Sequence, residues 1–486
     1  MDKLGKKSAV LSISNVITLV VTLITSMIIA RYRTLEENGT YTQLLLIINT
    51  IMPFALLGIP NSITYFIGKA LTKKDRNEYL GNCYSLLFII CFIVGILLYF
   101  FAGVISSRYN NPMIYRLRYV FIIFPVCLQI TSTISDVLVS CGEVRALVAY
   151  RVSYSILLLL VNLLMVFFEW RFDTYICIYT IVLVSLSIVA IVIVKTKIEV
   201  GRILLFDIKS IINILKFSIP MGIATVVGTL TLEFDKLFIS MKYSTETLGM
   251  YNYVAKELPI VAITNSVTAI LLPTITRMIS EGRKKEAVSI WSDSTIITFS
   301  ITMFFACGVF VFAPQVISIL YSDKYLTGLS VFRIYTFSLL LRFTYFGIIF
   351  NCTGNTRKIM YFSLAGLGLN IIFNYIFYYI FGINGPALAT VVSIYFIDYL
   401  ELRGTAKLMN TRVRNLLPWK HFAKIICINM LMGILFSVVQ NEVSLDMILG
   451  ANAEAIIIAL LWGGLYFFVI KKDLKRAWLN LNRGDA

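Results

Sequence analysis

Two arginines lie inside a strongly apolar stretch, residues 329–352, where they could bind an anion. Arg342 is embedded in a Leu-Leu-Leu-Arg-Phe run, and Arg333 precedes it at a spacing that places it about 180° around a helix. A charged residue at the centre of a membrane helix raises the free energy of insertion by about 2.5–3.5 kcal/mol, so a charged residue without a function is rare there. The planar guanidinium fork fits phosphate oxygens. We therefore predict that Arg342 and Arg333 line a cationic substrate cavity.

A second set of polar side chains recurs at helical spacing within residues 217–242. One face of that helix would carry Gly222, Thr225, Thr229 and Lys236. Glu233 and Asp235 flank this face about 200° apart, so both cannot point squarely into one cavity. Glu233 and Lys236 are three residues apart and could instead pair with each other. Thr225, Thr229, Glu233, Asp235 and Lys236 are all candidate cavity residues.

The first apolar stretch, residues 8–30, carries a similar stripe. Its members are Asn15, Thr18, Thr22 and Thr25, spaced three or four residues apart. Small polar residues of this kind either line a cavity or pack helices against one another, and both interpretations stay open. We count Asn15, Thr18 and Thr22 among the candidate cavity residues.

The stretch that follows residue 250 is unusually polar for a membrane helix, and Lys256 is its candidate cavity residue. Pro259 and Pro273 predict that this helix is bent or broken, which is common around transport sites. Asp136 lies in the fourth apolar stretch. Asp398 and Glu454 lie near a helix end or in the last two stretches, so they are weaker candidates.

The elements that must position these residues are about fourteen apolar runs of roughly 20 residues, each long enough to cross a membrane as a helix. With 58% hydrophobic and 14% charged residues, the composition excludes a soluble protein. Most of the 43 Lys and Arg residues fall in alternate loops. By the positive-inside rule, we expect a multi-pass protein of the bacterial inner membrane with both termini in the cytoplasm. The same pattern accounts for the net charge of +17 without nucleic acid as a partner.

The loops are too short for an independent catalytic domain, and no P-loop pattern is present. The eight cysteines lie in or beside apolar runs without a C-x-x-C pair, which indicates buried thiols. We therefore expect a transporter and no enzyme activity.

The two halves of the chain resemble each other at a nearly constant offset. Gly142 and Arg145 correspond to Gly354 and Arg357, and Asn162 corresponds to Asn374. Six spans separate equivalent points, which predicts two six-helix bundles related by a parallel pseudo-two-fold axis, plus two C-terminal helices. The predicted division is residues 1–200, 201–410 and 411–486, the last with a basic cytoplasmic tail.

These motifs resemble those of the multidrug/oligosaccharidyl-lipid/polysaccharide (MOP) exporter superfamily, and within it the Wzx-type O-antigen and capsule polysaccharide flippases. The resemblance covers nearly the whole chain. It rests on Ala30-Arg31, Gly39-Thr40-Tyr41, Leu57-Gly58-Ile59-Pro60, Phe217-Ser218-Ile219-Pro220, Asp235, Gly249-Met250-Tyr251, Gly354-Asn355-Thr356 and Gly382-Ile383-Asn384-Gly385-Pro386-Ala387.

The resemblance implies an all-α, MATE-like fold that moves an undecaprenyl-pyrophosphate-linked oligosaccharide by alternating access. It implies no cofactor beyond Na⁺ or H⁺ coupling, and it supports Arg31, Asp235 and Arg342 as cavity residues. The expected partners are the lipid-linked oligosaccharide, membrane lipids, a polysaccharide polymerase and glycosyltransferases. A MATE-type drug antiporter and a non-transporting scaffold for glycan assembly are the alternatives. The first apolar stretch lacks the acidic residue common in drug antiporters, which weakens that alternative.

Overall fold

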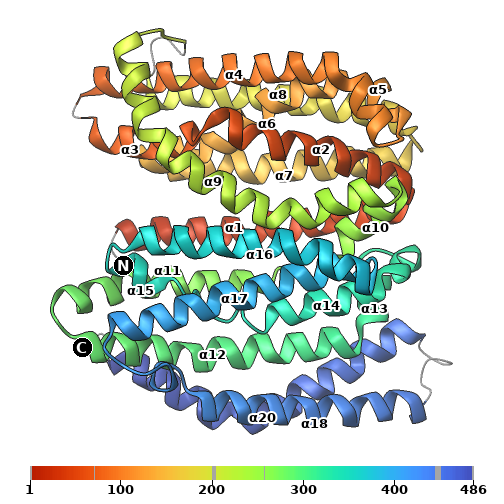
Figure 1. The fold of residues 1–486 in the computed structure, drawn as a ribbon, viewed down its shortest axis with the longest axis vertical. Coiled ribbons are helices and arrows are strands. Elements are labelled where there is room, and N and C mark those ends of the chain that lie inside the picture. The colour runs from red at the N-terminus through yellow and green to blue at the C-terminus, as the bar shows by residue number, and fades with distance from the viewer. Residues whose placement is uncertain (1–2, 71, 200–203, 257, 444–449, 484–486) are drawn as a thin grey trace. The chain divides into compact units, whose positions relative to one another are not determined.

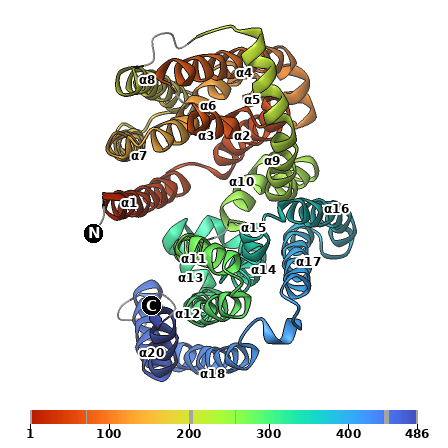
Figure 2. The ribbon, with the colours of Figure 1, turned by 90° about the vertical axis from the view of Figure 1, so that its left-hand side faces the viewer.

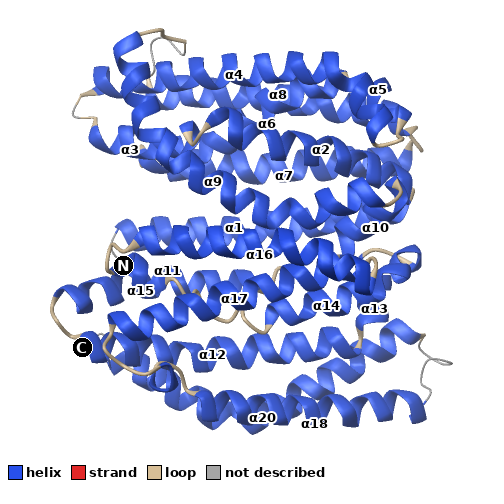
Figure 3. Cartoon of the chain, in the orientation of Figure 1, coloured by secondary structure: helices blue, strands red, loops and turns tan. Residues whose placement is uncertain are grey.

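The computed structural model describes residues 3–70, 72–199, 204–256, 258–443 and 450–483. The regular secondary structure in this part of the chain is all helical, and short loops and turns join the helices (Figure 3). It forms two compact units, Met1–Met250 (unit 1) and Tyr251–Ala486 (unit 2). The helices of unit 1 are α1 (Lys3–Tyr32), α2 (Leu35–Leu56), α3 (Ile59–Lys69), α4 (Lys73–Arg108), α5 (Pro112–Arg116), α6 (Tyr119–Ser140), α7 (Val144–Phe167), α8 (Phe172–Ile198) and α9 (Ile208–Lys242); α10 (Thr245–Val254) links the units. Unit 2 contains α11 (Val261–Ser280), α12 (Lys284–Val311), α13 (Ala313–Leu320), η1 (Asp323–Gly328), α14 (Leu329–Leu339), α15 (Ile348–Cys352), α16 (Thr356–Phe381), α17 (Asn384–Leu408), η2 (Val413–Asn415), α18 (Trp419–Val443) and α20 (Ala451–Arg483) (Figure 1).

Twelve of the described helices are long and apolar enough to cross a membrane, or thirteen if α9 is counted, which bends by 44° between Ile219 and Met221. The sequence predicts about fourteen, and the difference is the tenth stretch. There α14 ends at Leu339 and α15 begins at Ile348, so the backbone leaves the helix in between. The predicted interruption near Pro259 is present, because α10 ends at Val254 and α11 begins at Val261.

Short polar motifs fix where two of the unit 1 helices begin. The Thr34 hydroxyl accepts a hydrogen bond from the Glu37 amide, and the Glu37 carboxylate accepts one from the Thr34 amide, both at 3.1 Å. Thr72 and Asp75 make the same reciprocal pair before α4. Each capping box satisfies two backbone N–H groups that the first turn would otherwise leave unpaired. The helix boundaries therefore lie in the turns that the sequence marks.

The internal repeat has a backbone counterpart. Gly142 and Gly354 both adopt a left-handed conformation, with φ of 77° and 71°. Asn162 and Asn374 are both fully buried, and each donates from Nδ2 to the carbonyl four residues earlier at 2.7 Å. The helices α7 and α8 begin at the same offset from α16 and α17. The two halves thus share local structure as well as scattered residues.

One pair of repeat motifs meets within unit 1 at the N-terminal ends of α2 and α10. A Cβ atom on Gly39 would overlap the carbonyl of Thr245, and one on Gly249 would overlap the carbonyl of Leu35. Only glycine allows two backbones to approach this closely. The motifs Gly39-Thr40-Tyr41 and Gly249-Met250-Tyr251 are therefore packing motifs, brought together by their glycines.

A second glycine crossing joins the other end of α2 to α9. A Cβ atom on Gly58 would lie 2.6 Å from the backbone nitrogen of Gly222, and one on Gly222 would overlap the backbone of Leu57. Gly58 also has a φ of 77°, which a residue with a side chain rarely adopts. Helix α2 is thus held to the following helices at both of its ends.

These crossings explain where unit 1 ends. Helix α9 packs on α2, α3 and α4, so residues up to 250 form one compact body. The predicted division after residue 200 concerns the sequence repeat, whose second copy begins with α9. That division into residues 1–200, 201–410 and 411–486 stays a prediction.

Candidate functional site

A polar cluster in unit 1 connects three helices. Asn15 of α1 is exposed, and its Oδ1 accepts a hydrogen bond from Arg151 Nη1 of α7 at 2.8 Å. Arg151 Nε donates to the Ser135 hydroxyl of α6 at 3.2 Å. Asp136, the next residue, lies close enough to Arg151 for electrostatic attraction. A half-buried guanidinium is therefore held in a defined position beside the exposed face of α1.

Sequence reasoning missed Arg151 as a site residue. Helix α7 begins at Val144, so Arg151 lies two turns inside a helix and not in one of the basic loops. The signal that was available is the distance from Gly142, whose left-handed conformation ends the preceding turn. A basic residue two turns past such a glycine lies on a helix rather than in a loop.

The predicted stripe on α1 has different surroundings from one residue to the next. Thr22 is exposed, whereas Thr18 is half-buried and its hydroxyl has no hydrogen-bond partner among the described residues. Large apolar side chains occupy the opposite face and are also exposed: Ile13, Val16, Ile17, Val20 and Ile24. An exposed apolar strip suits lipid and an exposed polar strip suits water. Helix α1 thus has the two faces expected of a helix between lipid and an aqueous cavity.

The candidate residues of α9 fall into two groups. Thr225 accepts a hydrogen bond from Asn61 of α3 at 2.9 Å, and Thr229 is half-buried one turn further on. Asn61 is another residue that the sequence analysis did not single out, although it directly follows the Gly58-Ile59-Pro60 motif. The shared hydrogen bond ties the polar face of α9 to the start of α3.

Further along α9, Lys236 and Glu233 form an ion pair with a 3.0 Å separation between Nζ and Oε2. The alternative that these two residues pair with each other is therefore the one observed. Asp235 is buried, and one of its oxygens accepts the Lys236 backbone N–H at 2.8 Å. Glu233 and Asp235 consequently lie in different environments, as their separation around the helix requires.

At the end of α1 two arginines, two residues apart, differ sharply. Arg31 is exposed in the last turn. Arg33 is buried, donates from Nη2 to the Trp170 carbonyl at 2.8 Å, and lies 5.0 Å from the Tyr175 ring centre. Arg33 therefore fixes the end of α1 to α8 and its preceding loop, while Arg31 keeps an accessible charge.

In unit 2, Arg342 lies in the non-helical segment between α14 and α15. Neighbouring side chains hold this segment in place: Trp291 of α12 donates from Nε1 to the Thr344 hydroxyl at 2.8 Å, and the Phe343 ring packs against Phe299 with centroids 5.0 Å apart. Irregular backbone at membrane depth is tolerated where it lines a cavity or is buried in protein. The break thus presents Arg342 from a supported loop rather than from a straight helix.

A cavity of about 490 Å³ borders this break. Its lining includes Leu341 and Phe343 on either side of Arg342, and the carboxylate of Asp398. Aromatic rings make up much of the remaining wall: Phe299, Phe346, Tyr395, Tyr399, Trp419 and Phe422. The cavity therefore combines a largely apolar, aromatic wall with the single charged side chain of Asp398, and Arg342 lies next to two lining residues without lining the cavity itself.

A second cavity of about 540 Å³ lies between α12, α14 and α18, and most of its lining is apolar. Phe310 belongs to that lining, and the guanidinium of Arg333 lies 5.5 Å from the centre of its ring. Arg333 Nε is buried and has no hydrogen-bond partner among the described residues. Lys256 is exposed in the segment between α10 and α11. Arg333, Arg342 and Lys256 therefore occupy separate surroundings within unit 2.

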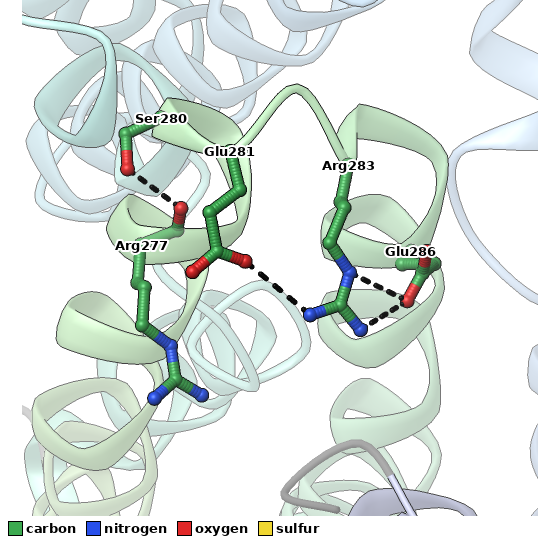
Figure 4. Close-up of polar contacts among 5 residues, drawn as sticks. All are labelled: Arg277, Ser280, Glu281, Arg283 and Glu286. Atoms are coloured by element: carbon green, nitrogen blue, oxygen red, sulfur yellow. Dashed lines mark hydrogen bonds and ion pairs between the residues drawn. The ribbon is translucent and has the colours of Figure 1, made fainter.

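Basic residues in the turns behave differently from those inside the helices. In the turn between α11 and α12, Arg283 forms ion pairs with Glu281 and Glu286 (Figure 4). The hydrogen bond with Glu286, and then the one with Glu281, raise the pKa of Arg283. Exposed pairs of this kind contribute little stability. The turn charges are thus satisfied locally at the surface, away from the cavities.

Known proteins provide a comparison for both the family and the fold of this chain. A family model for a polysaccharide biosynthesis protein matches residues 28–329. No curated protein sequence matches this chain.

Among solved structures, the lipid II flippase MurJ in an inward closed conformation has a TM-score of 0.72 at 15% identity, over 94% of this chain and 99% of that chain. An inward-facing multidrug resistance MATE transporter of the MOP superfamily has a TM-score of 0.69 at 12% identity, over 81% and 94%. A MOP superfamily transporter from Pyrococcus furiosus has a TM-score of 0.56 at 13% identity, over 84% and 96%. These likenesses establish a MATE-like fold. Because the family model covers more than half of its length, the chain belongs to the polysaccharide biosynthesis protein family.

Proposed function

We propose that this protein is a flippase that moves a lipid-linked oligosaccharide, carried on undecaprenyl pyrophosphate, across the inner membrane by alternating access. The product would serve surface polysaccharide synthesis, as O antigen, capsule or exopolysaccharide. The observation that carries the proposal is the position of Arg342, in a supported helix break beside a cavity of about 490 Å³, in a chain of the polysaccharide biosynthesis family.

The chemistry of the candidate residues supports a substrate with a phosphate group. Arg342 and Arg151 each present a guanidinium, whose planar fork pairs with phosphate oxygens in two parallel hydrogen bonds. Arg31 adds an exposed cation at the end of α1. Asn15, Thr18, Thr22, Thr225 and Thr229 supply hydroxyl and amide groups that can bind sugar hydroxyls. We expect them, together with Glu233, Asp235, Lys236, Lys256 and Arg333, to contact substrate at some stage of the cycle.

The apolar cavity between α12, α14 and α18 supports a lipid-linked cargo over a free sugar. A polyprenyl chain needs an apolar path, whereas a soluble glycan does not. We expect no covalent chemistry and coupling to Na⁺ or H⁺. The alternating basic loops support an orientation with both termini in the cytoplasm, and a polysaccharide polymerase and glycosyltransferases are the expected partners.

The test is deletion of the gene in its native host. We expect lipid-linked repeat units to accumulate on the cytoplasmic face and surface glycan to be lost, and the intact gene to restore both. Normal surface glycan in the deletion strain would refute the proposal.

A MATE-type antiporter of small molecules is the second candidate, because a multidrug resistance transporter shares the fold. It predicts altered drug sensitivity in the deletion strain and export of a soluble compound from reconstituted vesicles. Helix α1 carries no acidic residue between Ser8 and Ala30, which favours the flippase. A non-transporting scaffold for glycan assembly predicts full activity after neutral replacement of both Arg342 and Arg333.

A further inference from the structure

Polar side chains form a track along one face of α20, the last helix of unit 2. Glu454, Trp462, Tyr466 and Asp473 fall within about 120° of one another around the helix. From residue 454 to residue 473 the helix rises about 28 Å, close to the thickness of a membrane's hydrocarbon core. This face packs against α12 and α18, which lie beside α20 in both views (Figure 2). The track therefore extends through most of the membrane inside protein.

The outer half of the track contains buried polar atoms without partners. Glu454 Oε1 and Trp462 Nε1 of α20, and Asn429 Oδ1 of α18, make no hydrogen bond with any described residue. All three side chains are at most 2% exposed. An unpaired buried polar atom costs about 1–3 kcal/mol, so three of them along one seam need another partner. Water or a hydrated proton would supply it.

The inner half is connected by contacts of 2.8–3.9 Å. Ser300 contributes its carbonyl to one contact and its hydroxyl, which donates to the Ile296 carbonyl at 2.7 Å, to the next. Tyr466 lies beside the Asn429 side chain and donates from its hydroxyl to the Ser300 carbonyl of α12 at 2.8 Å. The Ser300 hydroxyl lies 3.4 Å from Nε2 of His421. The other ring nitrogen of His421 lies 3.9 Å from an Asp473 oxygen, which also accepts from Lys424.

His421 is the only histidine in the chain, and its place in this track suits proton transfer. An imidazole can accept a proton on one nitrogen and release one from the other near neutral pH. One ring nitrogen is near a buried hydroxyl, and the other is near a carboxylate that is partly exposed. His421 thus connects the buried part of the track to the surface.

We propose that α12, α18 and α20 enclose a proton path that runs from Glu454 past Tyr466 and His421 to Asp473. This inference rests on the proposed function and specifies its coupling ion. Helix packing by polar groups is the alternative, but it would leave those groups paired with each other.

The other titratable side chains around the path are few. On α12 they are Cys307, which interacts with Tyr466, and Asp293, two turns from Ser300 on the same face. On α18, Lys424 pairs with Asp473 at the inner end, where Arg476 of α20 also attracts the Asp473 carboxylate. Helix α13, which also contacts α20, contributes Gln315, whose buried Oε1 has no partner among the described residues. Glu454 is the buried carboxyl group in the outer half of α20.

Helix α12 links the path to the substrate side. It carries Ser300 in the path and Trp291, which holds the break that contains Arg342 through Thr344. A change of protonation that shifts α12 would therefore move a support of the break. This provides a physical route for coupling between proton movement and substrate movement.

The experiment uses the full-length protein in liposomes that contain a pH-sensitive dye, with an acid pulse applied outside. We expect Glu454→Gln and His421→Asn to slow proton uptake at least tenfold, and Tyr466→Phe to slow it while keeping the packing of the ring. Lys471→Gln, on the same helix but outside the polar face, is the matched control and should take up protons like the parent. Thermal unfolding of each variant separates a lost path from a lost fold.

Proton uptake by well-folded Glu454→Gln and Tyr466→Phe proteins at the parent rate would overturn the proposal. Absence of uptake by the parent protein would overturn it as well, while surface-glycan complementation could still uphold the flippase. Conversely, track-dependent proton uptake in a protein that fails complementation would keep the path and refute the proposed function.

Discussion

The two sequence repeats build corresponding elements in different ways. In the first repeat, α4 is one helix of 36 residues and α6 is one helix of 22 residues. In the second repeat, the counterpart of α4 is divided into α12 and α13, and the counterpart of α6 into α14 and α15. In these two stretches the first repeat has continuous helices, whereas the second has breaks at residue 312 and at residues 340–347.

Proline content accounts for only one of these two differences, because Pro314 lies at the start of α13 and α4 contains no proline. Helix α6 contains Pro125 and remains continuous. The tenth stretch contains no proline, yet it breaks where Trp291 binds Thr344 and where Phe343 packs into an aromatic cluster. The comparison teaches that tertiary contacts can open a membrane helix without a proline, and that this opening contains Arg342.

The largest effect should come from removing the charge at the break. We expect Arg342→Gln to reduce flipping about 10- to 100-fold, because a charge-assisted hydrogen bond contributes about 1.5–3 kcal/mol. Arg342→Lys should recover part of the activity, since it keeps the charge but loses the fork. The amount of surface glycan and the amount of accumulated lipid-linked repeat units measure the flipping activity of each variant. Arg357→Gln, in the exposed first turn of α16, is the control, and an equal loss there would show that the break has no special role.

Next in size is the glycine crossing between α2 and α9. Gly222→Ala should lower the free energy of unfolding by about 1–3 kcal/mol, because its Cβ would overlap the Leu57 backbone. Gly228→Ala, two turns along the same helix, meets no atom within 4 Å and should be neutral or stabilising by up to about 1 kcal/mol. Thermal unfolding in detergent measures both. Equal behaviour of the two variants would contradict the close crossing.

The support of the break can be compared directly with a continuous helix. Thr344→Val leaves the buried Trp291 N–H unpaired, at a cost of about 1–3 kcal/mol, and should also reduce flipping. Thr131→Val in α6 removes a hydroxyl that donates to the Cys127 and Leu128 carbonyls of its own helix, so its effect should be smaller. A larger loss at Thr131 would mean that the hydrogen bond to Trp291 does not hold the break.

The smallest effect concerns a surface pair of unit 1. The hydrogen bond and charge of Lys73, 2.7 Å away, lower the pKa of Glu199. The pair therefore stabilises the fold above the unfolded-state pKa of glutamate, about 4.3, and this contribution is lost as the pH falls through the folded-state value. In a plot of the free energy of unfolding against pH, Glu199→Gln should slightly reduce the loss of stability toward acid pH, whereas Glu36→Gln should not. An unchanged pH dependence for Glu199→Gln would show that the pair with Lys73 contributes no measurable stability.

Much of the fold could be predicted from the sequence. The lengths of most apolar runs, the break at Pro259 and the shared backbone of the Gly142 and Gly354 turns all follow from local patterns. These features depend on hydrophobicity and on conformations that few residues can adopt, so they can be read without knowledge of neighbours. The pairing of Glu233 with Lys236 was likewise available from their spacing.

The surroundings of the candidate residues could not be predicted. Nothing in the local sequence distinguishes Arg31 from Arg33, or shows that Arg151 of α7 would bind Asn15 of α1. These contacts join segments more than a hundred residues apart, and their geometry depends on how whole helices pack. The track along α20 is similar, because its members come from three helices.

The sequence by itself determined that this is a multi-pass helical protein built from a repeat, because burial of apolar helices in lipid is set by composition and spacing. Only the tertiary structure decided which charges are paired at the surface, which are held beside a cavity, and where a helix opens without a proline. The physical reason is that a polar group inside a membrane protein is stabilised by its particular neighbours, and those neighbours are assigned by packing.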